Sequence, residues 1–248
     1  MIGDFKHIMM KEFEMTDLGL MSYFLGIEVI QGDDGIFIHE RKFAEFLKKF
    51  KMKDSNSVKT PIETGIKLTK EGYGQTVDAT YFKQIVGSLR YLTCTRPDIC
   101  YVVGLISRYM ELPRQVHLQV VKRIMRYIKG TTAFGLFYSS SKKIEIVRYS
   151  DSDWGGDSYE RKSTSGNCFM IGKTVCLWSS KKQSIVALST CEAEYVAAAA
   201  SACQSVWLSN IMTQIEDQIA DIFTKPLKID VFIKLRDILG MKVVPNQN

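Results

Sequence analysis

Three carboxylate residues stand where a metal-dependent nuclease could use them: Asp151, Glu194 and Asp221. Asp151 follows a strand-like run at 144–149, and Glu194 lies in the first turns of a predicted helix. Phosphodiester hydrolysis by two Mg²⁺ ions about 4 Å apart needs several carboxylates that converge from separate elements. Acids are also common as caps at strand ends and helix starts. Spacing alone therefore leaves both a nuclease site and a structural role open.

Two neighbouring acids are weaker candidates for the same site. Side chains two positions apart on a helix point in different directions, so we expect Glu192 to point away from the position that Glu194 faces. Asp153 lies on the same side as Asp151 if the strand continues, which makes it a secondary candidate. The sequence therefore favours Asp151 and Glu194 as the first pair of ligands.

A second acidic pair, Asp33-Asp34, is flanked by glycines between two strand-like runs. Polymerases carry adjacent Asp residues at a hairpin tip, but there an aromatic residue stands two positions before the pair. Here Gln31 and Gly32 precede it, so we interpret the pair as a solvated hairpin turn.

The elements that must position these acids give a fold of the α/β (α+β) class. Around the site the patterns predict three strands, at 144–149, 167–171 and 174–179, and then a helix at 191–212 with Ser189-Thr190 as its cap. We expect Tyr195 to lie on the buried side of that helix. Upstream, the patterns predict strands at 23–30 and 36–39, and helices at 5–13, 42–52, 78–91, 98–110 and 114–129.

The charged residues on the outer side of the helix at 114–129 are all basic. Its outer residues are Lys122, Arg123, Arg126 and Lys129, with no acid between them. Such a row is either a solvated face or a surface that lies along a phosphate backbone and releases counterions. A polar loop is predicted at 54–74, and Ser139-Ser140-Ser141 is a plausible domain boundary.

Composition excludes several classes of protein. The 248 residues are 46% hydrophobic with a net charge of +6, which is enough for packed cores and compatible with nucleic-acid binding. The six cysteines form no C-x-x-C pair, and we expect reduced thiols in the core of an intracellular protein, cytoplasmic or nuclear and not secreted. No apolar run reaches the roughly 18–20 residues of a membrane span, so no membrane association is expected.

Several motifs resemble the ribonuclease H region of copia-type LTR retrotransposon Pol polyproteins. They read YSDSDW at 149–154, RKSTSG at 161–166, WSSKKQ at 178–183, LSTCEAEY at 188–195 and ADIFTKP at 220–226. Upstream motifs resemble the end of the reverse transcriptase palm, its thumb and the connection: LGIE at 25–28, VGSLRYL at 86–92, TRPDI at 95–99 and RYIKGT at 126–131. The resemblance covers nearly the whole chain in order.

The resemblance implies three segments. Residues 1–75 would be a C-terminal remnant of the palm, and residues 76–140 a helical thumb and connection region. Residues 141–248 would be a ribonuclease H-like domain with an incomplete mixed sheet and helices, internally deleted near 212–213.

The resemblance also assigns roles to residues. Asp151 and Glu194 would be the first two catalytic carboxylates and Asp221 the last, all three binding Mg²⁺ or Mn²⁺ if activity remains. Lys181 and Lys182 would lie near an RNA–DNA hybrid. The helix at 114–129 would lie along the template–primer and contact it through its four basic residues.

Two departures from the family pattern weaken the expectation of catalysis. The aromatic-x-Asp-Asp hairpin of the polymerase is absent, so no polymerase activity is expected. Between Met212 and Thr213 the family has a strand with an Asp-Asn-x-Ser-type motif, and this chain lacks it and its catalytic Asp. The sequence therefore predicts a truncated, internally deleted relic of a Pol polyprotein that ancestrally degraded the RNA strand of RNA–DNA hybrids and retains little or no catalysis. The competing hypotheses are a divergent ribonuclease H, a nucleic-acid-binding remnant without turnover, and a product that folds only in part. The sequence does not specify an oligomeric state.

Overall fold

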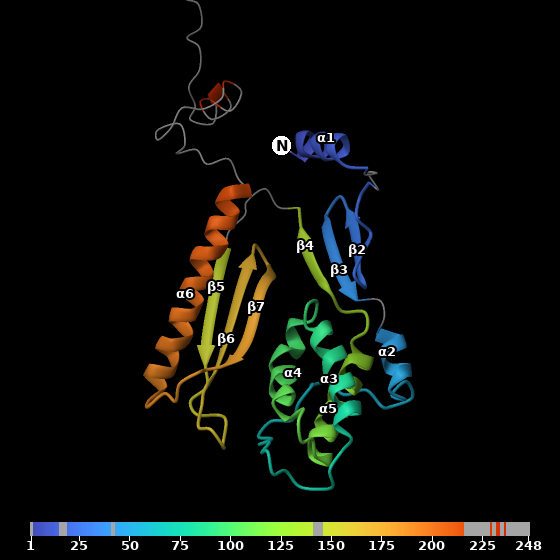
Figure 1. Ribbon diagram of the computed structural model, residues 1–248, viewed down its shortest axis with the longest axis vertical. Helices are drawn as coiled ribbons and strands as arrows, with labels where there is room; N and C mark the ends of the chain where they lie inside the picture. Colours follow the sequence, from blue (N-terminus) through green and yellow to red (C-terminus); the bar gives the residue numbers. More distant parts are fainter. Residues whose placement is uncertain are drawn as a thin grey trace, which may run out of the picture. The chain divides into compact units, whose positions relative to one another are not determined.

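The computed structural model describes residues 2–14, 19–40, 43–140 and 146–215, together with residues 229, 232, 233 and 236. The chain divides into two compact units, Met1–Ala197 and Ala198–Asn248. The first unit contains two antiparallel sheets and a group of helices, which gives a mixed α/β architecture (Figure 1).

The first sheet has the strand order β1-β2-β3-β4. Helix α1 (Ile2–Glu12) precedes β1 (Tyr23–Phe24), β2 (Ile27–Gly32) and β3 (Gly35–Glu40), and the fourth strand is β4 (Leu136–Ser139). Asp33 and Asp34 form the exposed turn between β2 and β3, which confirms the predicted hairpin. Gly35 has φ of 149°, and a Cβ there would lie 2.1 Å from the carbonyl oxygen of Tyr138, so only glycine allows β4 to pair at this point.

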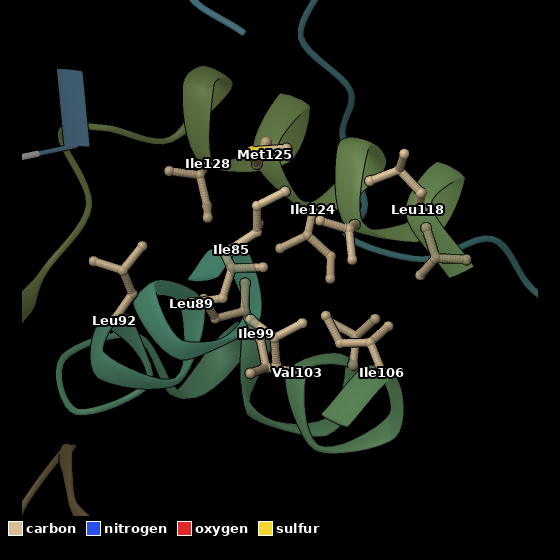
Figure 2. Packing of buried hydrophobic residues seen from close by; sticks show 14 of the residues in the cluster. Ile85, Leu89, Leu92, Ile99, Val103, Ile106, Leu118, Ile124, Met125 and Ile128 are labelled. Carbon is tan, nitrogen blue, oxygen red and sulfur yellow. The ribbon is translucent and has the colours of Figure 1, made fainter. Parts of the chain in front are cut away.

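A helical core lies between the two sheets in sequence. It is built from α2 (Phe43–Lys49), α3 (Ala79–Leu92), α4 (Cys100–Ile106) and α5 (Gln115–Gly130). Residues such as Ile85, Leu89, Ile124 and Ile128 repeat at helical spacing and are fully buried (Figure 2). Each buried aliphatic side chain of this kind contributes about 2 kcal/mol. The core also contains Phe43 and Leu68, so it joins residues from both sides of the boundary predicted at 75/76.

Arg96 fixes the junction between α3 and α5 although its side chain is only 2% exposed. Its Nε and Nη2 atoms donate to Asp98 at 2.9 and 2.6 Å, and its Nη1 and Nη2 donate to the carbonyl and hydroxyl of Thr131 at 3.1 and 2.7 Å. The guanidinium also lies over the rings of Phe43 and Tyr127. A buried charge is tolerated here because its donors are paired.

The second sheet has the order β5-β6-β7, formed by β5 (Ile146–Ser152), β6 (Thr164–Ile171) and β7 (Thr174–Lys182). One of its faces is closed by the start of α6 (Thr190–Ile215), where Ala193 and Ala197 are buried together with Phe169. Gln183 crosslinks this face, because its Nε2 donates to the Ser165 hydroxyl at 2.9 Å and to the Ala193 carbonyl at 2.9 Å. These contacts position the first turns of α6 against the sheet.

Four expectations need correction. The strand predicted at 23–30 is two antiparallel strands, because Leu25 and Gly26 have φ of 47° and 89° and turn the chain. The helix predicted at 98–110 is α4 flanked by the 3₁₀ turns Pro97–Ile99 and Ser107–Tyr109. The sheet predicted as mixed is antiparallel throughout its three described strands.

The fourth correction concerns side chains predicted to be buried. Tyr195 is 77% exposed, because the small residues Ala193 and Ala197 form the contact instead and allow the helix to lie close to the sheet. The six cysteines are free thiols, as expected, but none is in the core: three are half-buried and three exposed.

Candidate functional site

Asp151 and Glu194 both reach the end of β5. Asp151 is exposed and pairs with Gly166 on the neighbouring strand. The Oε1 atom of Glu194 accepts a hydrogen bond from the backbone N–H of Ser152 at 3.2 Å. The Glu194 carboxylate therefore lies beside the residue that follows Asp151.

The two carboxylates approach the strand end from different directions. Side chains alternate along a strand, so Asp151 shares a face with its partner Gly166, while Ser152 lies on the other face. The Ser152 hydroxyl accepts from Gln183 at 3.1 Å, which places it on the face closed by α6. Asp151 instead lines a groove on the opposite face, and Glu194 does not line that groove.

The neighbouring acids have local structural partners. Asp153 Oδ1 accepts a short hydrogen bond from the Thr164 N–H, which holds the loop after β5 against the start of β6. Glu192 Oε2 accepts from the Leu188 N–H at 2.6 Å, and the Ser189 hydroxyl accepts from the Glu192 N–H at 3.1 Å. Glu192 therefore caps the N-terminus of α6 and points away from the strand, as its position predicts.

The carboxylates of the described residues do not fit a pair of metal ions. No group of three or more His, Cys, Asp or Glu side chains within the described ranges could hold a metal ion. Asp221, the third predicted ligand, lies outside those ranges. Mg²⁺ binds with one or two carboxylates and several waters, whereas a two-ion centre needs more anionic ligands. Asp151 and Glu194 together could supply at most part of the shell of one ion.

Three of the four predicted basic residues on α5 contact the loop that precedes α3. Arg123 pairs with Glu63, Arg126 Nε donates to the Asn56 carbonyl at 2.6 Å, and Lys129 Nζ donates to the Ser55 carbonyl at 2.6 Å. Lys122 is exposed. The two carbonyls are neutral, so they do not cancel the positive charges of Arg126 and Lys129. Helix α5 therefore holds the loop in place and also presents a positive surface.

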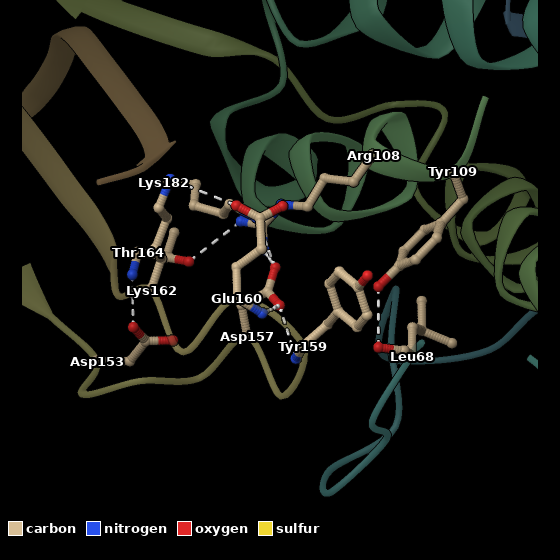
Figure 3. A network of polar contacts seen from close by, with 10 residues as sticks. All are labelled: Leu68, Arg108, Tyr109, Asp153, Asp157, Tyr159, Glu160, Lys162, Thr164 and Lys182. Carbon is tan, nitrogen blue, oxygen red and sulfur yellow. Dashed lines mark hydrogen bonds and ion pairs between the residues drawn. The ribbon is translucent and has the colours of Figure 1, made fainter. Parts of the chain in front are cut away.

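The two predicted basic residues at the end of β7 differ in their surroundings. Lys181 is exposed, whereas Lys182 Nζ lies 2.7 Å from Asp157 and 2.9 Å from Glu160 (Figure 3). Arg108 also reaches Asp157, at 3.4 Å, from the turn that follows α4. Burial opposes ionisation of Asp157, but hydrogen bonds from the Glu160 N–H and from Lys182 outweigh it and lower its pKa to about 2.

The sequence did not indicate the groove that Asp151 lines. It has a volume of about 680 Å³ and lies between the start of α4 and the face of the second sheet opposite α6. Its aromatic residues are Tyr101, Tyr149 and Trp178, and the Trp178 indole is held by a hydrogen bond to the Thr93 carbonyl at 3.0 Å. Strand alternation could have predicted that Tyr149 lies on the same face as Asp151. The other two aromatic residues of the groove, Tyr101 and Trp178, come from distant parts of the chain, so local patterns do not predict them.

Residues 1–64 match the model of the family described as reverse transcriptase (RNA-dependent DNA polymerase). This match places the N-terminal part of the chain, with its β2–β3 hairpin, in the class of reverse transcriptase-related proteins. No solved structure matches the chain.

Relatives extend the likeness across most of the sequence. The chain is 38% identical over 199 residues to an uncharacterized mitochondrial protein of Arabidopsis thaliana, covering 79% of this chain and 82% of that protein. It is 36% identical over 206 residues to the retrovirus-related Pol polyprotein from transposon RE1 of A. thaliana, covering 83% of this chain and 14% of the polyprotein. It is also 36% identical over 225 residues to the retrovirus-related Pol polyprotein from transposon TNT 1-94 of Nicotiana tabacum, covering 87% of this chain and 17% of that polyprotein.

The chain belongs to the family of copia-type retrotransposon Pol polyproteins and contains part of their reverse transcriptase region. It spans about a sixth or less of the length of the Pol polyproteins named above. Within the described residues, no helix is long and apolar enough to cross a membrane.

Proposed function

We propose that the segment from β5 to α6 derives from a ribonuclease H-type nuclease and that the chain binds nucleic acid without cutting it. The observation that carries the proposal is the position of Glu194, whose carboxylate accepts from the Ser152 N–H at 3.2 Å beside Asp151. A strand that ends in one carboxylate and a following helix that brings a second one is the arrangement that the matching motifs imply for such a nuclease. By the same resemblance, residues 1–75 derive from the palm and 76–140 from the thumb and connection.

Loss of cleavage follows from the number and direction of the ligands. Asp151 opens into the groove, whereas Glu194 lies on the side of α6 and uses one oxygen on the Ser152 backbone. The carboxylates of Asp151 and Glu194 would neutralise only part of the charge of two Mg²⁺ ions, so the second ion would not be held. The family's Asp-Asn-x-Ser-type motif, which would supply a further Asp, is missing between Met212 and Thr213.

Binding is supported by the charges that stay available. Lys122 and Lys181 are exposed, and Arg126 and Lys129 contact only neutral carbonyls among the partners described above. Each phosphate that such a side chain neutralises releases counterions, so binding weakens as salt increases. An RNA–DNA hybrid is the proposed partner, because it is the substrate class that the motifs around Asp151 imply.

The test uses the full chain and a hybrid whose RNA strand carries a 5′ label. We expect salt-dependent binding and no RNA fragments with either Mg²⁺ or Mn²⁺. Cleavage that is abolished by Asp151→Asn would overturn the proposal and establish the alternative, a divergent hybrid ribonuclease. Absence of binding at low salt by a chain with native circular dichroism would also overturn it.

A further inference from the structure

The groove beside Asp151 owes its depth to one missing side chain. On the face opposite α6, the strand pairings align Tyr149 with Cys168 and Trp178 in one row, and Asp151 with Gly166 and Ser180 in the next. A Cβ at Gly166 would have only the Asp151 carbonyl within reach, at 4.0 Å, so the space above this residue is open. Gly166 therefore forms the floor of the groove between Asp151 and Ser180, and we call this part of the groove the slot.

Aromatic rings form the walls of this slot. Tyr149 is 59% exposed and Tyr101 is 48% exposed, which leaves ring surface available to a ligand. Trp178 is half-buried and fixed by its hydrogen bond to the Thr93 carbonyl. Rigid aromatic surfaces of this kind stack on flat rings, and they stack on any nucleobase.

Charge is divided between this slot and a second hollow. Among the described residues that line the slot there is no Lys or Arg, and three exposed carboxylates line it: Asp98, Asp151 and Asp153. Asp98 accepts hydrogen bonds from Arg96 and Tyr127, and Asp153 accepts from the Thr164 N–H, so Asp151 is the carboxylate beside Gly166 that we assign to the ligand. The second hollow, of about 370 Å³, shares Cys100 and Ser180 with the first. It is lined by four basic residues: Arg90, Arg108, Lys181 and Lys182.

The geometry points to a site for an unpaired nucleobase, and this inference rests on the nucleic-acid binding proposed above. The base stacks in the slot over Gly166, and the neighbouring backbone phosphates lie against the basic hollow. The Asp151 carboxylate accepts a hydrogen bond from an exocyclic amine, which favours adenine and cytosine over thymine. A fully paired blunt hybrid offers no free base, so the slot distinguishes single strands and overhangs from duplexes.

The test compares fluorescein-labelled oligo(dC) and oligo(dT) with a blunt RNA–DNA hybrid by anisotropy, using the full chain. Gly166→Val fills the slot without deleting any contact, and we expect it to weaken oligo(dC) binding about tenfold while hybrid affinity is unchanged. Gly32→Val is the matched control, because Gly32 is also a strand residue with open space around it, outside the slot. This control should leave both affinities unchanged.

Two further variants keep the inference testable if Gly166→Val fails to fold. Tyr149→Ala removes an exposed ring and should also weaken oligo(dC) selectively, while Asp151→Asn should abolish the preference for oligo(dC) over oligo(dT). The inference would be overturned if a variant lost equal affinity for the hybrid and the single strand. It would also be overturned if a folded Gly166→Val protein lost no affinity for oligo(dC). Binding of the hybrid without binding of single strands would overturn this inference alone. Binding of neither would overturn the proposed function as well.

Discussion

Asp157 and Lys182 form an ion pair at 2.7 Å that ties the loop between β5 and β6 to the end of β7. The Asp157 side chain is only 12% exposed, and its second oxygen accepts from the N–H groups of Tyr159 and Glu160 at 3.0 and 2.9 Å. Because Arg108 reaches the same carboxylate, the loop is also attached to the turn after α4. One side chain therefore holds the rim of the basic hollow in place.

Neutralising this carboxylate should destabilise the protein at neutral pH. A pKa lowered from 3.8 to about 2 means that the folded state favours the ionised form. Asp157→Asn should lower the free energy of unfolding by about 2 kcal/mol at pH 7, measured by urea denaturation. Asp33→Asn in the exposed hairpin turn is the control and should have no effect.

The same carboxylate predicts how stability depends on acid. Because the folded pKa lies below the unfolded one, the contribution is present above about pH 4 and is lost as the pH falls towards 2. The wild type should lose stability over this window, and Asp157→Asn should lose about 2 kcal/mol less. Parallel curves for the two proteins would contradict the assignment.

His117 predicts a second pH dependence nearer neutrality. The ring is stacked on Tyr109 with centroids 4.0 Å apart, its Nδ1 accepts from the Arg114 N–H at 3.0 Å, and its Nε2 lies 3.0 Å from the Thr69 carbonyl. With Nδ1 an acceptor, Nε2 is the donor and the ring is neutral. Burial is the main cause that lowers the pKa of His117 below its usual 6.5, while the bond to Thr69 opposes this change.

Stability should therefore be greatest above about pH 6.5 and fall as the pH drops below it, since the unfolded chain then takes up a proton first. His117→Gln should flatten the dependence between pH 8 and 5 in urea denaturation. His7→Gln, at an exposed position of α1, should leave it unchanged. Stability that rises on acidification would show that the ring is charged in the fold.

Replacing Arg96 should destabilise the helical core. Arg96→Met takes the guanidinium away from the Asp98 carboxylate, which is 33% exposed and still accepts from the Tyr127 hydroxyl at 2.7 Å. We expect a loss of about 2–3 kcal/mol, because hydrogen bonds to a charged group contribute about 1.5–3 kcal/mol. Adding Asp98→Asn removes the orphaned charge and should recover part of the loss, as measured by thermal unfolding of both variants. A double variant less stable than Arg96→Met would contradict this explanation.

The basic helix can be divided by function with two variants. Arg126→Ala should speed hydrogen exchange in the loop at 55–63, because its guanidinium holds the Asn56 carbonyl. Lys122→Ala should leave exchange and stability unchanged and should reduce the slope of log affinity against log salt by about one for the hybrid. If the slope of log affinity against log salt is the same for Lys122→Ala and the wild type, α5 is not part of the binding surface.

Local patterns predicted much of this fold. The hairpin at Asp33-Asp34, the helix at 114–129 and the cap of α6 at Ser189 all depend on residues within a few positions of each other. Helix geometry also predicted that Glu192 and Glu194 point in different directions, but not that Glu194 lies on the side of α6 while Asp151 opens into the groove. The break at Leu25 was missed, since a left-handed leucine has no sequence signal of its own.

Long-range partners set the limit of such prediction. Arg126 appeared free on a charged face, yet its partner is the Asn56 carbonyl, and Arg108 pairs with Asp157 across a comparable separation. The slot over Gly166 depends on Tyr101 as well as on strand register, so no single stretch of sequence contains it. Such contacts are decided by packing between elements.

The pairing of β3 with β4 has a consequence for how the protein is made. Gly35 pairs with Ser139, and helices α2 to α5 lie between the two strands in the chain. A ribosome adds about 5–20 residues per second, so β3 emerges several seconds before the strand that covers its edge. During that interval an uncovered edge is available to other nascent chains. Slower translation of the helical core should therefore lower the soluble yield of this protein.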